Sequence, residues 1–300
     1  MPSKINSSAF FSEWKGHPIS DLAKFRDTTR AVRPGKPIVY LAGDSSLDNK
    51  AWVTASEPIS PAQIYKETLR TSSYSGIKPD IAYWLNHFLG DRATCINAAI
   101  EESLLRERDD RLLEHDLFIR DSITANDILI VSVGANDIAL RPTTSTMLHM
   151  ADLAWTTRRS SIQDGSASSL VYFRKMFKDK TENYISRMLE KQKPRAVIVC
   201  MIYYPLEADA GQTGWADMQL KALGYNMRPG QLQAAIKQIY ESATKNIRIE
   251  GTQVLTYPLF EVLDPRDAKD FTARVEPSTE GGRKMAQRFS EMVTSILGDV

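Results

Sequence analysis

Five short apolar runs recur along this 300-residue chain, and each is bounded by charged or turn-forming residues. The runs are nearly continuous in apolar residues and do not alternate with polar ones. Continuous runs are typical of strands that are covered on both faces, as in a parallel sheet, whereas half-exposed strands alternate. The pattern therefore predicts five strands of one parallel sheet, at residues 37–42, 94–97, 127–133, 196–203 and 253–257.

Helical patterns lie between these runs. One apolar stripe at helical spacing covers residues 81–88, and another covers residues 232–240 behind Pro229, a residue favoured in the first turn of a helix. Strands that alternate with helices predict an α/β fold, a three-layer αβα sandwich around a five-stranded parallel sheet. The length fits a single domain, and we assign residues 1–300 to it.

The composition argues against several classes of function. The formal net charge is +1 and basic residues are scattered among acidic ones, so we expect neither nucleic acid nor an acidic membrane as a partner. The sequence has no apolar segment of signal-peptide or membrane-spanning length, which predicts a cytoplasmic protein. Its two cysteines lie in apolar runs and are expected to be buried thiols. Dinucleotide, P-loop and zinc-protease motifs are missing from the sequence, so no cofactor and no metal are predicted.

Polar residues follow two of the apolar runs at positions where functional groups gather. Ligands bind open parallel sheets beyond the carboxyl ends of the strands. Ser45 follows the run at 37–42, and Asn136 follows the run at 127–133. We therefore expect a nucleophilic hydroxyl and a donor for a negatively charged oxygen at the same edge. A structural interpretation stays open, since Asp44 and Asn136 can also cap helices or hold turns.

Two longer connections leave the same edge, at residues 141–170 and 205–230. Both are rich in Ser, Thr, Gly and Gln, with interspersed Trp and Met residues. They could form a cap over the site, and they could equally be surface loops.

The sequence around Ser45 and Asn136 resembles the SGNH hydrolase superfamily, also called GDSL esterases and lipases. Gly43-Asp44-Ser45 is similar to the family's first block, and Gly134-Ala135-Asn136-Asp137 is similar to its G-x-N-D block. The resemblance covers roughly residues 37–290. It implies a flavodoxin-like sheet, a small-molecule ester or acyl substrate, Ser45 as nucleophile and Asn136 as oxyanion donor, with Asp44 and Asp137 in supporting positions.

The chain departs from this family at two other blocks. Where the family has N-x-G, this chain has Asn97-Ala98-Ala99, which implies the Ala99 backbone N–H as an oxyanion donor and Asn97 in support. Where the family has D-x-x-H-P, this chain has Ala273-Arg274-Val275-Glu276-Pro277. Glu276 thus replaces the histidine, and Ala273 replaces the aspartate.

Glu276 is therefore the expected base, and its basicity decides whether it can act. A carboxylate has a reference pKa of about 4.3 against about 6.5 for histidine, which is roughly 3 kcal/mol less driving force. Burial can raise the pKa of a glutamate to about 6–7, so Glu276 must be buried beside Ser45. We also expect Ser45 to begin a helix whose dipole supports a negative oxygen. His149 is the alternative base, because the segment that contains it is expected near the functional edge.

These features predict a serine hydrolase with an atypical base that acts on a carboxylic ester or related acyl group. Two alternatives stay open because the usual histidine and aspartate are replaced. One is a non-hydrolytic catalyst, such as an isomerase, cyclase or acyl transferase, that uses the same oxyanion hole. The other is a catalytically inactive binding protein that keeps the scaffold. No motif indicates an oligomeric state.

Overall fold

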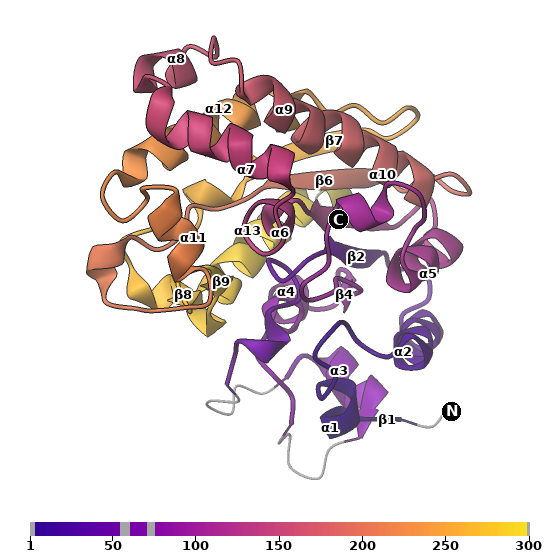
Figure 1. The fold of residues 1–300 in the computed structure, drawn as a ribbon. Helices are drawn as coiled ribbons and strands as arrows, with labels where there is room; N and C mark the ends of the chain where they lie inside the picture. The colour runs from indigo at the N-terminus through magenta and orange to yellow at the C-terminus, as the bar shows by residue number, and fades with distance from the viewer. Residues whose placement is uncertain (1–3, 55–60, 71–75, 299–300) are drawn as a thin grey trace.

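The computed structural model describes residues 4–54, 61–70 and 76–298 of the chain (Figure 1). Its centre is a five-stranded sheet in the order β4-β2-β5-β6-β7, and each neighbouring pair of strands is parallel. The predicted α/β sandwich around a five-stranded parallel sheet is confirmed. The strands are β2 (Ile38–Gly43), β4 (Thr94–Asn97), β5 (Ile128–Ser132), β6 (Ala196–Met201) and β7 (Gln253–Pro258).

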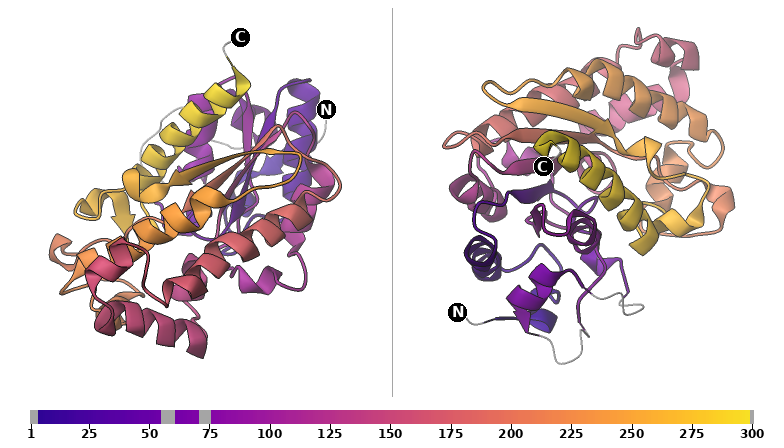
Figure 2. Two further views of the ribbon diagram at one scale, coloured as in Figure 1. Left: turned by 90° about the horizontal axis from the view of Figure 1, so that it is seen from above. Right: turned by 180° about the vertical axis from the view of Figure 1, so that it is seen from behind.

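The strand order determines which helices cover which face. Numbered along the chain, the five strands lie in the order 2-1-3-4-5, which is the flavodoxin-like arrangement. Crossovers between parallel strands are right-handed. The crossover from β2 to β4 runs across the sheet in the opposite direction to the later crossovers, so it lies on the opposite face. On one face, α4 (Ile81–Leu89) packs against the C-terminal helix α13 (Thr279–Leu297) (Figure 2). The other face carries α5 (Glu114–Ser122), α10 (Thr181–Met188) and α12 (Pro229–Ser242).

Shorter elements complete the described structure. Two small sheets pair β1 (Ile5–Asn6) with β3 (Leu69–Arg70), and β8 (Phe271–Thr272) with β9 (Glu276–Pro277). Two π-helical segments, Asp152–Thr156 and Lys175–Lys180, continue α7 and α9. No helix in the described part of the chain is both long enough and apolar enough to span a bilayer. The remaining α-helices are α1 (Ser7–Phe10), α2 (Ile19–Val32), α3 (Gln63–Thr68), α6 (Ala135–Ile138), α7 (Thr144–Ala151), α8 (Arg159–Gln163), α9 (Leu170–Arg174) and α11 (Asp217–Ala222).

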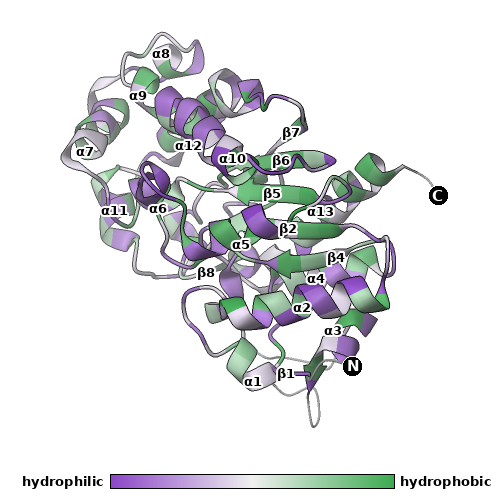
Figure 3. Cartoon of the chain, turned by 90° about the vertical axis from the view of Figure 1, so that its right-hand side faces the viewer, coloured by the Kyte–Doolittle hydropathy of each residue, from purple (hydrophilic) through white to green (hydrophobic). Residues whose placement is uncertain are grey.

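The central strands are buried over their whole length. Every residue of β2, β5 and β6 is buried, and Figure 3 shows these strands as hydrophobic. The edge strand β7 is partly exposed along most of its length. The prediction that the strands are covered on both faces is therefore confirmed for the central strands and only partly for the edge strand β7.

Gly43 ends β2 where the backbones of two strands come very close. Its φ is +145°, and a Cβ at this position would lie 1.8 Å from the carbonyl oxygen of Ser132 on β5. We expect Gly43→Ala to lower the free energy of unfolding by about 2–3 kcal/mol, because β2 must move away from β5. Urea unfolding of the two proteins measures this difference.

Gly35→Ala is the matched control for this prediction. Gly35 also has a positive φ, +77°, but a Cβ there would meet nothing within 4 Å. Gly35→Ala is therefore expected to lower the free energy of unfolding by only about 1 kcal/mol, from backbone strain. Equal losses of stability in the two variants would contradict the steric explanation for Gly43.

Candidate active site

The ends of β2 and β5 bring Ser45 and Asn136 into one pocket. Gly43 pairs with Ser132, so the turns that follow the two strands begin side by side. The chain leaves β2 and β5 toward opposite faces of the sheet, and such a topological switch point is where α/β sheets bind ligands. Ser45, Asn136 and Glu276 all line the pocket formed there. Three of the predicted site residues therefore come together.

Ser45 lies in a tight turn and not at the start of a helix, which corrects the expectation from the sequence. Asp44 Oδ1 accepts a hydrogen bond from Ser46 N at 3.0 Å, and Asp44 O accepts one from Asp48 N at 2.9 Å. The chain then forms a short 3-10 helix at Asn49–Ala51. Because the Asp44 side chain satisfies the backbone in a turn conformation, Ser45 gains no support from a helix dipole.

Asp44 holds this turn through its neighbour Ser46. Ser46 Oγ lies 2.6 Å from Asp44 Oδ1 and 2.7 Å from Ser132 Oγ, which links the ends of β2 and β5. Asp44 Oδ2 has no hydrogen-bond partner among the described residues. Burial raises the pKa of Asp44 to about 6, although the hydrogen bonds from Ser46 lower it. These contacts support the structural interpretation of Asp44.

Asn136 is held at the tip of β5 by the loop that follows β4. Gly134, with φ +101°, turns the chain out of β5, and Asn136 follows in α6. Asn136 Nδ2 donates a hydrogen bond to Ser103 O at 3.1 Å. A carboxamide NH₂ has two hydrogens, which leaves the second for a ligand. Asp137 accepts a hydrogen bond from Leu105 N at 2.6 Å and so anchors the same loop.

The backbone N–H of Ala99 already has a partner in this structure. It donates to Asn97 Oδ1 at 3.1 Å, while Asn97 Nδ2 donates to Leu47 O at 2.9 Å. Ala99 is fully buried and is not among the residues that line the pocket. Asn97 therefore ties the end of β4 to the turn after β2. A role of Ala99 in the oxyanion hole would require its N–H to leave Asn97.

Glu276 reaches the pocket from the short strand β9 and is only 1% exposed. Its Oε1 accepts a hydrogen bond from the Trp215 indole N–H at 3.0 Å. Its Oε2 is buried and has no hydrogen-bond partner among the described residues. The Ser45 hydroxyl nevertheless lies near enough to stabilise the ionised carboxylate. Glu276 therefore places a carboxylate beside the candidate nucleophile.

The buried position makes Glu276 unusually basic for a carboxylate. Burial raises the pKa of Glu276 to about 7. The nearby Ser45 hydroxyl and the hydrogen bond from Trp215 lower this pKa, whereas the negative charges of Asp44 and Asp48 raise it. The result is close to the reference pKa of histidine, about 6.5. Burial thus raises the pKa of Glu276 into the range that a general base beside Ser45 would need.

Arg274 fixes the hairpin that carries Glu276. Ala273 and Arg274 turn the chain with φ values of +51° and +69°. The buried Arg274 side chain forms an ion pair with Asp217 at 2.8 Å. This ion pair binds the β8–β9 hairpin to the connection that also carries Trp215. The Glu276 carboxylate and its indole partner are therefore held by the same contact.

A second buried carboxyl group, Glu101, lies beside Glu276 and was not predicted. Its Oε1 accepts a hydrogen bond from Trp52 Nε1 at 3.2 Å, and its Oε2 is buried without a partner among the described residues. Burial, and then the charges of Glu276 and Asp48, raise the pKa of Glu101 to about 9. The sequence feature that could have pointed to Glu101 is its position soon after Ala99, in a predicted site segment. Nothing in the sequence placed that residue against the far end of the chain.

None of the four histidines, which all lie among the described residues, lines this pocket. His149 is in the last turn of α7, where its Nδ1 lies 3.0 Å from Ser169 Oγ and its ring stacks on Tyr172. His17 is stacked on Phe10, and burial lowers its pKa to about 3. This arrangement gives no support to His149 as the base. Across the residues that the structure describes, no group of three or more His, Cys, Asp and Glu side chains is arranged to hold a metal ion.

Both longer connections contribute to the walls of the pocket. They are bound to each other, since Trp155 Nε1 donates a hydrogen bond to Ala222 O at 2.8 Å. Whether they act as a cap over the site stays a prediction. Their lining residues are Met150, Leu153 and Ala154 from 141–170, and Pro205, Trp215, Leu220 and Leu223 from 205–230.

Comparisons with known proteins find similarity in structure. No family model and no curated protein matches the sequence. A family 3 carbohydrate esterase from Clostridium thermocellum is 11% identical over 87% of this chain and 97% of its own, with a TM-score of 0.41. An acetyl esterase mutant with a bound acetate ion is 13% identical over 87% of this chain and 98% of its own, with a TM-score of 0.35. Both TM-scores are below 0.5, so we infer function from the residues of this chain alone.

Proposed function

We propose that this chain is an SGNH-type serine hydrolase that acts on a carboxylic ester or a related acyl group. The observation that carries the proposal is the Ser45 hydroxyl beside the buried Glu276 carboxylate, whose pKa is about 7. A serine is a weak nucleophile by itself and needs an adjacent general base. A general base is most effective when its pKa lies near the operating pH, and Glu276 meets that condition.

Each catalytic step can be assigned to one of three side chains. Ser45 Oγ attacks the carbonyl carbon of the substrate while Glu276 takes the hydroxyl proton. The carbonyl oxygen becomes an oxyanion, which the free N–H of Asn136 stabilises. Glu276 then gives the proton to the leaving alcohol as the ester C–O bond breaks, and the acyl group remains on Ser45. Water attacks this acyl group while Glu276 takes a proton from the water. The bond between Ser45 Oγ and the acyl carbon then breaks, Glu276 returns the proton to Ser45 Oγ, and the carboxylic acid is released.

Covalent labelling tests the nucleophile directly. A fluorophosphonate probe is expected to label the wild-type protein and to leave Ser45→Ala unlabelled, as seen by intact mass. Ser46→Ala is the matched control, because its hydroxyl is engaged with Asp44 and Ser132. This variant should still be labelled.

The same experiment separates the alternatives. A folded wild-type protein that resists the probe and hydrolyses no ester would contradict the proposal. A protein of that kind would fit the non-hydrolytic catalyst or the inactive binding protein. Labelling that persists in Ser45→Ala would show that another residue is the nucleophile.

Trp215 is a positioning residue for the base, and its replacement should shift the pH dependence of activity. The indole N–H stabilises the ionised form of Glu276, so Trp215→Phe is expected to raise the pKa of the base by about one unit. The acid limb of the pH–kcat profile should move up by the same amount. At pH 6, kcat should fall about tenfold.

Trp155→Phe is the control for this shift, because the Trp155 indole donates to Ala222 O away from Glu276. Its acid limb should coincide with that of the wild type. An unchanged acid limb in Trp215→Phe would show that the indole does not tune the base.

A further inference from the structure

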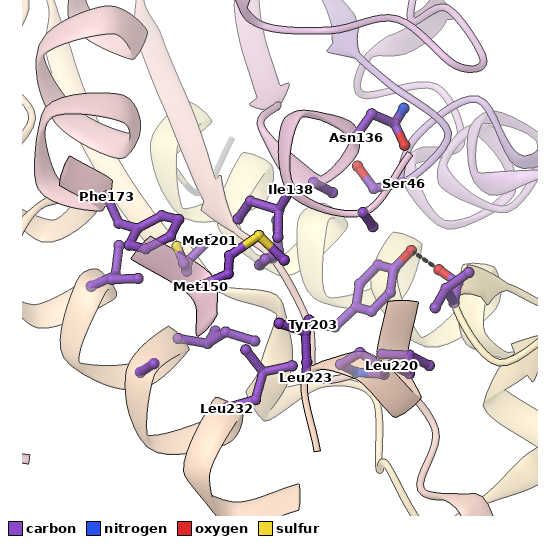
Figure 4. A pocket seen from close by; sticks show the side chains of 18 of the residues that line it. Ser46, Asn136, Ile138, Met150, Phe173, Met201, Tyr203, Leu220, Leu223 and Leu232 are labelled. Carbon is purple, nitrogen blue, oxygen red and sulfur yellow. Dashed lines mark hydrogen bonds between the residues drawn. The ribbon is translucent and has the colours of Figure 1, made fainter. Parts of the chain in front are cut away.

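Beyond the reacting groups, the pocket continues as a space walled by hydrocarbon. We call this part the apolar chamber, and it is lined by Ile138, Met150, Leu153, Phe173, Phe177 and Ile236. Figure 4 shows Ser46 and Asn136 at one end of the pocket and Phe173 at the other. The empty space of the pocket, with its open mouth included, is about 1110 Å³.

The charge of the walls is as informative as their shape. No Lys, Arg, His or Asp of the described chain lines the pocket, and Glu276 stands at the polar end. Gln231 lines the pocket too, but its Nε2 is engaged with Leu153 O at 2.7 Å and Thr157 O at 2.9 Å. The chamber therefore offers no counter-charge to an ionised group, and few free polar groups for a sugar.

One face of helix α12 gives a measure of the length of the chamber. Leu232, Ala235, Ile236 and Ile239 lie on one face of this helix and line the pocket in succession. Seven residues of α-helix rise by about 10–11 Å. An extended chain of bonded atoms advances about 1.2 Å per atom, so this face is as long as about eight or nine atoms.

We propose that the apolar chamber binds an uncharged, unbranched aliphatic acyl chain of about eight carbons, with the carbonyl carbon toward Ser45. Apolar walls gain by excluding water from hydrocarbon, and each buried methylene should strengthen binding about fourfold. A charged group in the chamber would lose its hydration without a partner. The orientation of the chain rests on the proposed function, whereas its binding in the chamber does not.

Binding to the Ser45→Ala protein tests the chamber without turnover. Trp215 lines the pocket, so its fluorescence reports on occupancy, and calorimetry provides an independent measure. Methyl octanoate is expected to bind about 250-fold more tightly than methyl butyrate, because it has four more methylenes and each contributes about fourfold. Monomethyl suberate has the same length but ends in a carboxylate, and it should bind at least about 100-fold more weakly than methyl octanoate.

A pair of adjacent alanines on α12 tests the location. Ala235 lines the pocket, whereas Ala234 is half-buried and lies outside it. The phenylalanine in Ala235→Phe should fill the chamber. It should weaken the binding of methyl octanoate about tenfold or more relative to the binding of methyl butyrate. Ala234→Phe should leave that ratio within about twofold, and thermal melting should show that both variants fold.

The outcomes distinguish this inference from the proposed function. Equal affinities for the octanoate and butyrate esters, tight binding of the charged ester, or an unaltered ratio in Ala235→Phe would each overturn the chamber assignment. Hydrolysis of esters by the wild type without a preference for chain length would also count against it, while leaving the hydrolase proposal in place. Tight binding of methyl octanoate by a protein that hydrolyses no ester would uphold the chamber and refute the hydrolase.

Discussion

Replacement of Glu276 by glutamine is expected to lower kcat for ester hydrolysis by about 10²–10⁴-fold, which is the usual contribution of a general base. Glutamine keeps the shape of the side chain and an oxygen for the Trp215 indole, but it cannot accept the proton of Ser45. The wild type should lose activity as the pH falls through about 7, because the base acts only when it is deprotonated. Initial rates between pH 5 and pH 9 measure both effects.

Glu280→Gln is the matched control for this loss. Glu280 is four positions further along the chain, does not line the pocket, and pairs with Arg283 at 2.7 Å. Its kcat should stay within about twofold of the wild type, as expected for an exposed ion pair. If Glu276→Gln keeps the wild-type rate and pH profile, another group removes the proton from Ser45.

The sheet was predictable because burial on both faces leaves a direct trace in the sequence. The central strands β2, β5 and β6 are apolar at nearly every position, and the structure buries all of them. Ser45 and Asn136 could be placed at one edge for the same reason, since both follow strands of a parallel sheet. Their common pocket follows from the topology and needed no knowledge of side-chain contacts.

The details that failed depend on competition between local hydrogen bonds. Ser45 was expected to begin a helix, but Asp44 bonds to Ser46 N and holds a turn. The N–H of Ala99 was expected to face the substrate, but the side chain of Asn97 accepts its hydrogen bond. Short polar side chains compete in this way wherever they can reach nearby backbone groups.

The surroundings of Glu276, the proposed base, could not be predicted from the sequence. Trp215 and Glu101 both adjoin Glu276, yet they come from different connections and share no motif with it. Their positions depend on how the loops fold over the sheet edge. Long-range packing therefore decides the pKa of Glu276. From the sequence we could infer only that Glu276 must be buried to act as a base.

The same packing concentrates negative charge in the interior. Asp44, Glu101 and Glu276 are each at most 3% exposed, and each keeps one carboxylate oxygen without a hydrogen-bond partner among the described residues. Lys50 is buried nearby, but its ammonium is bonded to Asp48 at 2.7 Å. Ionising this group of carboxyls is costly in a low-dielectric interior. The fold should therefore prefer conditions in which part of the group stays protonated.

The free energy of unfolding is accordingly expected to fall as the pH rises from about 5 to about 9. In the unfolded chain a glutamate titrates near about 4.3, whereas the pKa of Glu101 in the folded protein is about 9. Between these values the folded state holds the extra proton, and a state that binds more protons loses stability as the pH rises. Urea unfolding at pH 5, 7 and 9 measures the slope. Glu101→Gln removes this titration, so it should be more stable than the wild type by about 6 kcal/mol at pH 9 and by about 1 kcal/mol at pH 5.

Glu102→Gln provides a control of opposite sign at the next position. Glu102 forms an ion pair with Lys15 at 2.8 Å, and the hydrogen bond from Lys15 lowers the pKa of Glu102. Its ionised form therefore stabilises the fold above about pH 4.3. Glu102→Gln should lower the free energy of unfolding at pH 9 by less than about 1 kcal/mol, because the pair is partly exposed. A wild-type stability that is flat from pH 5 to pH 9, or a Glu101→Gln variant that is no more stable than the wild type at pH 9, would mean that Glu101 ionises at little cost in the folded protein.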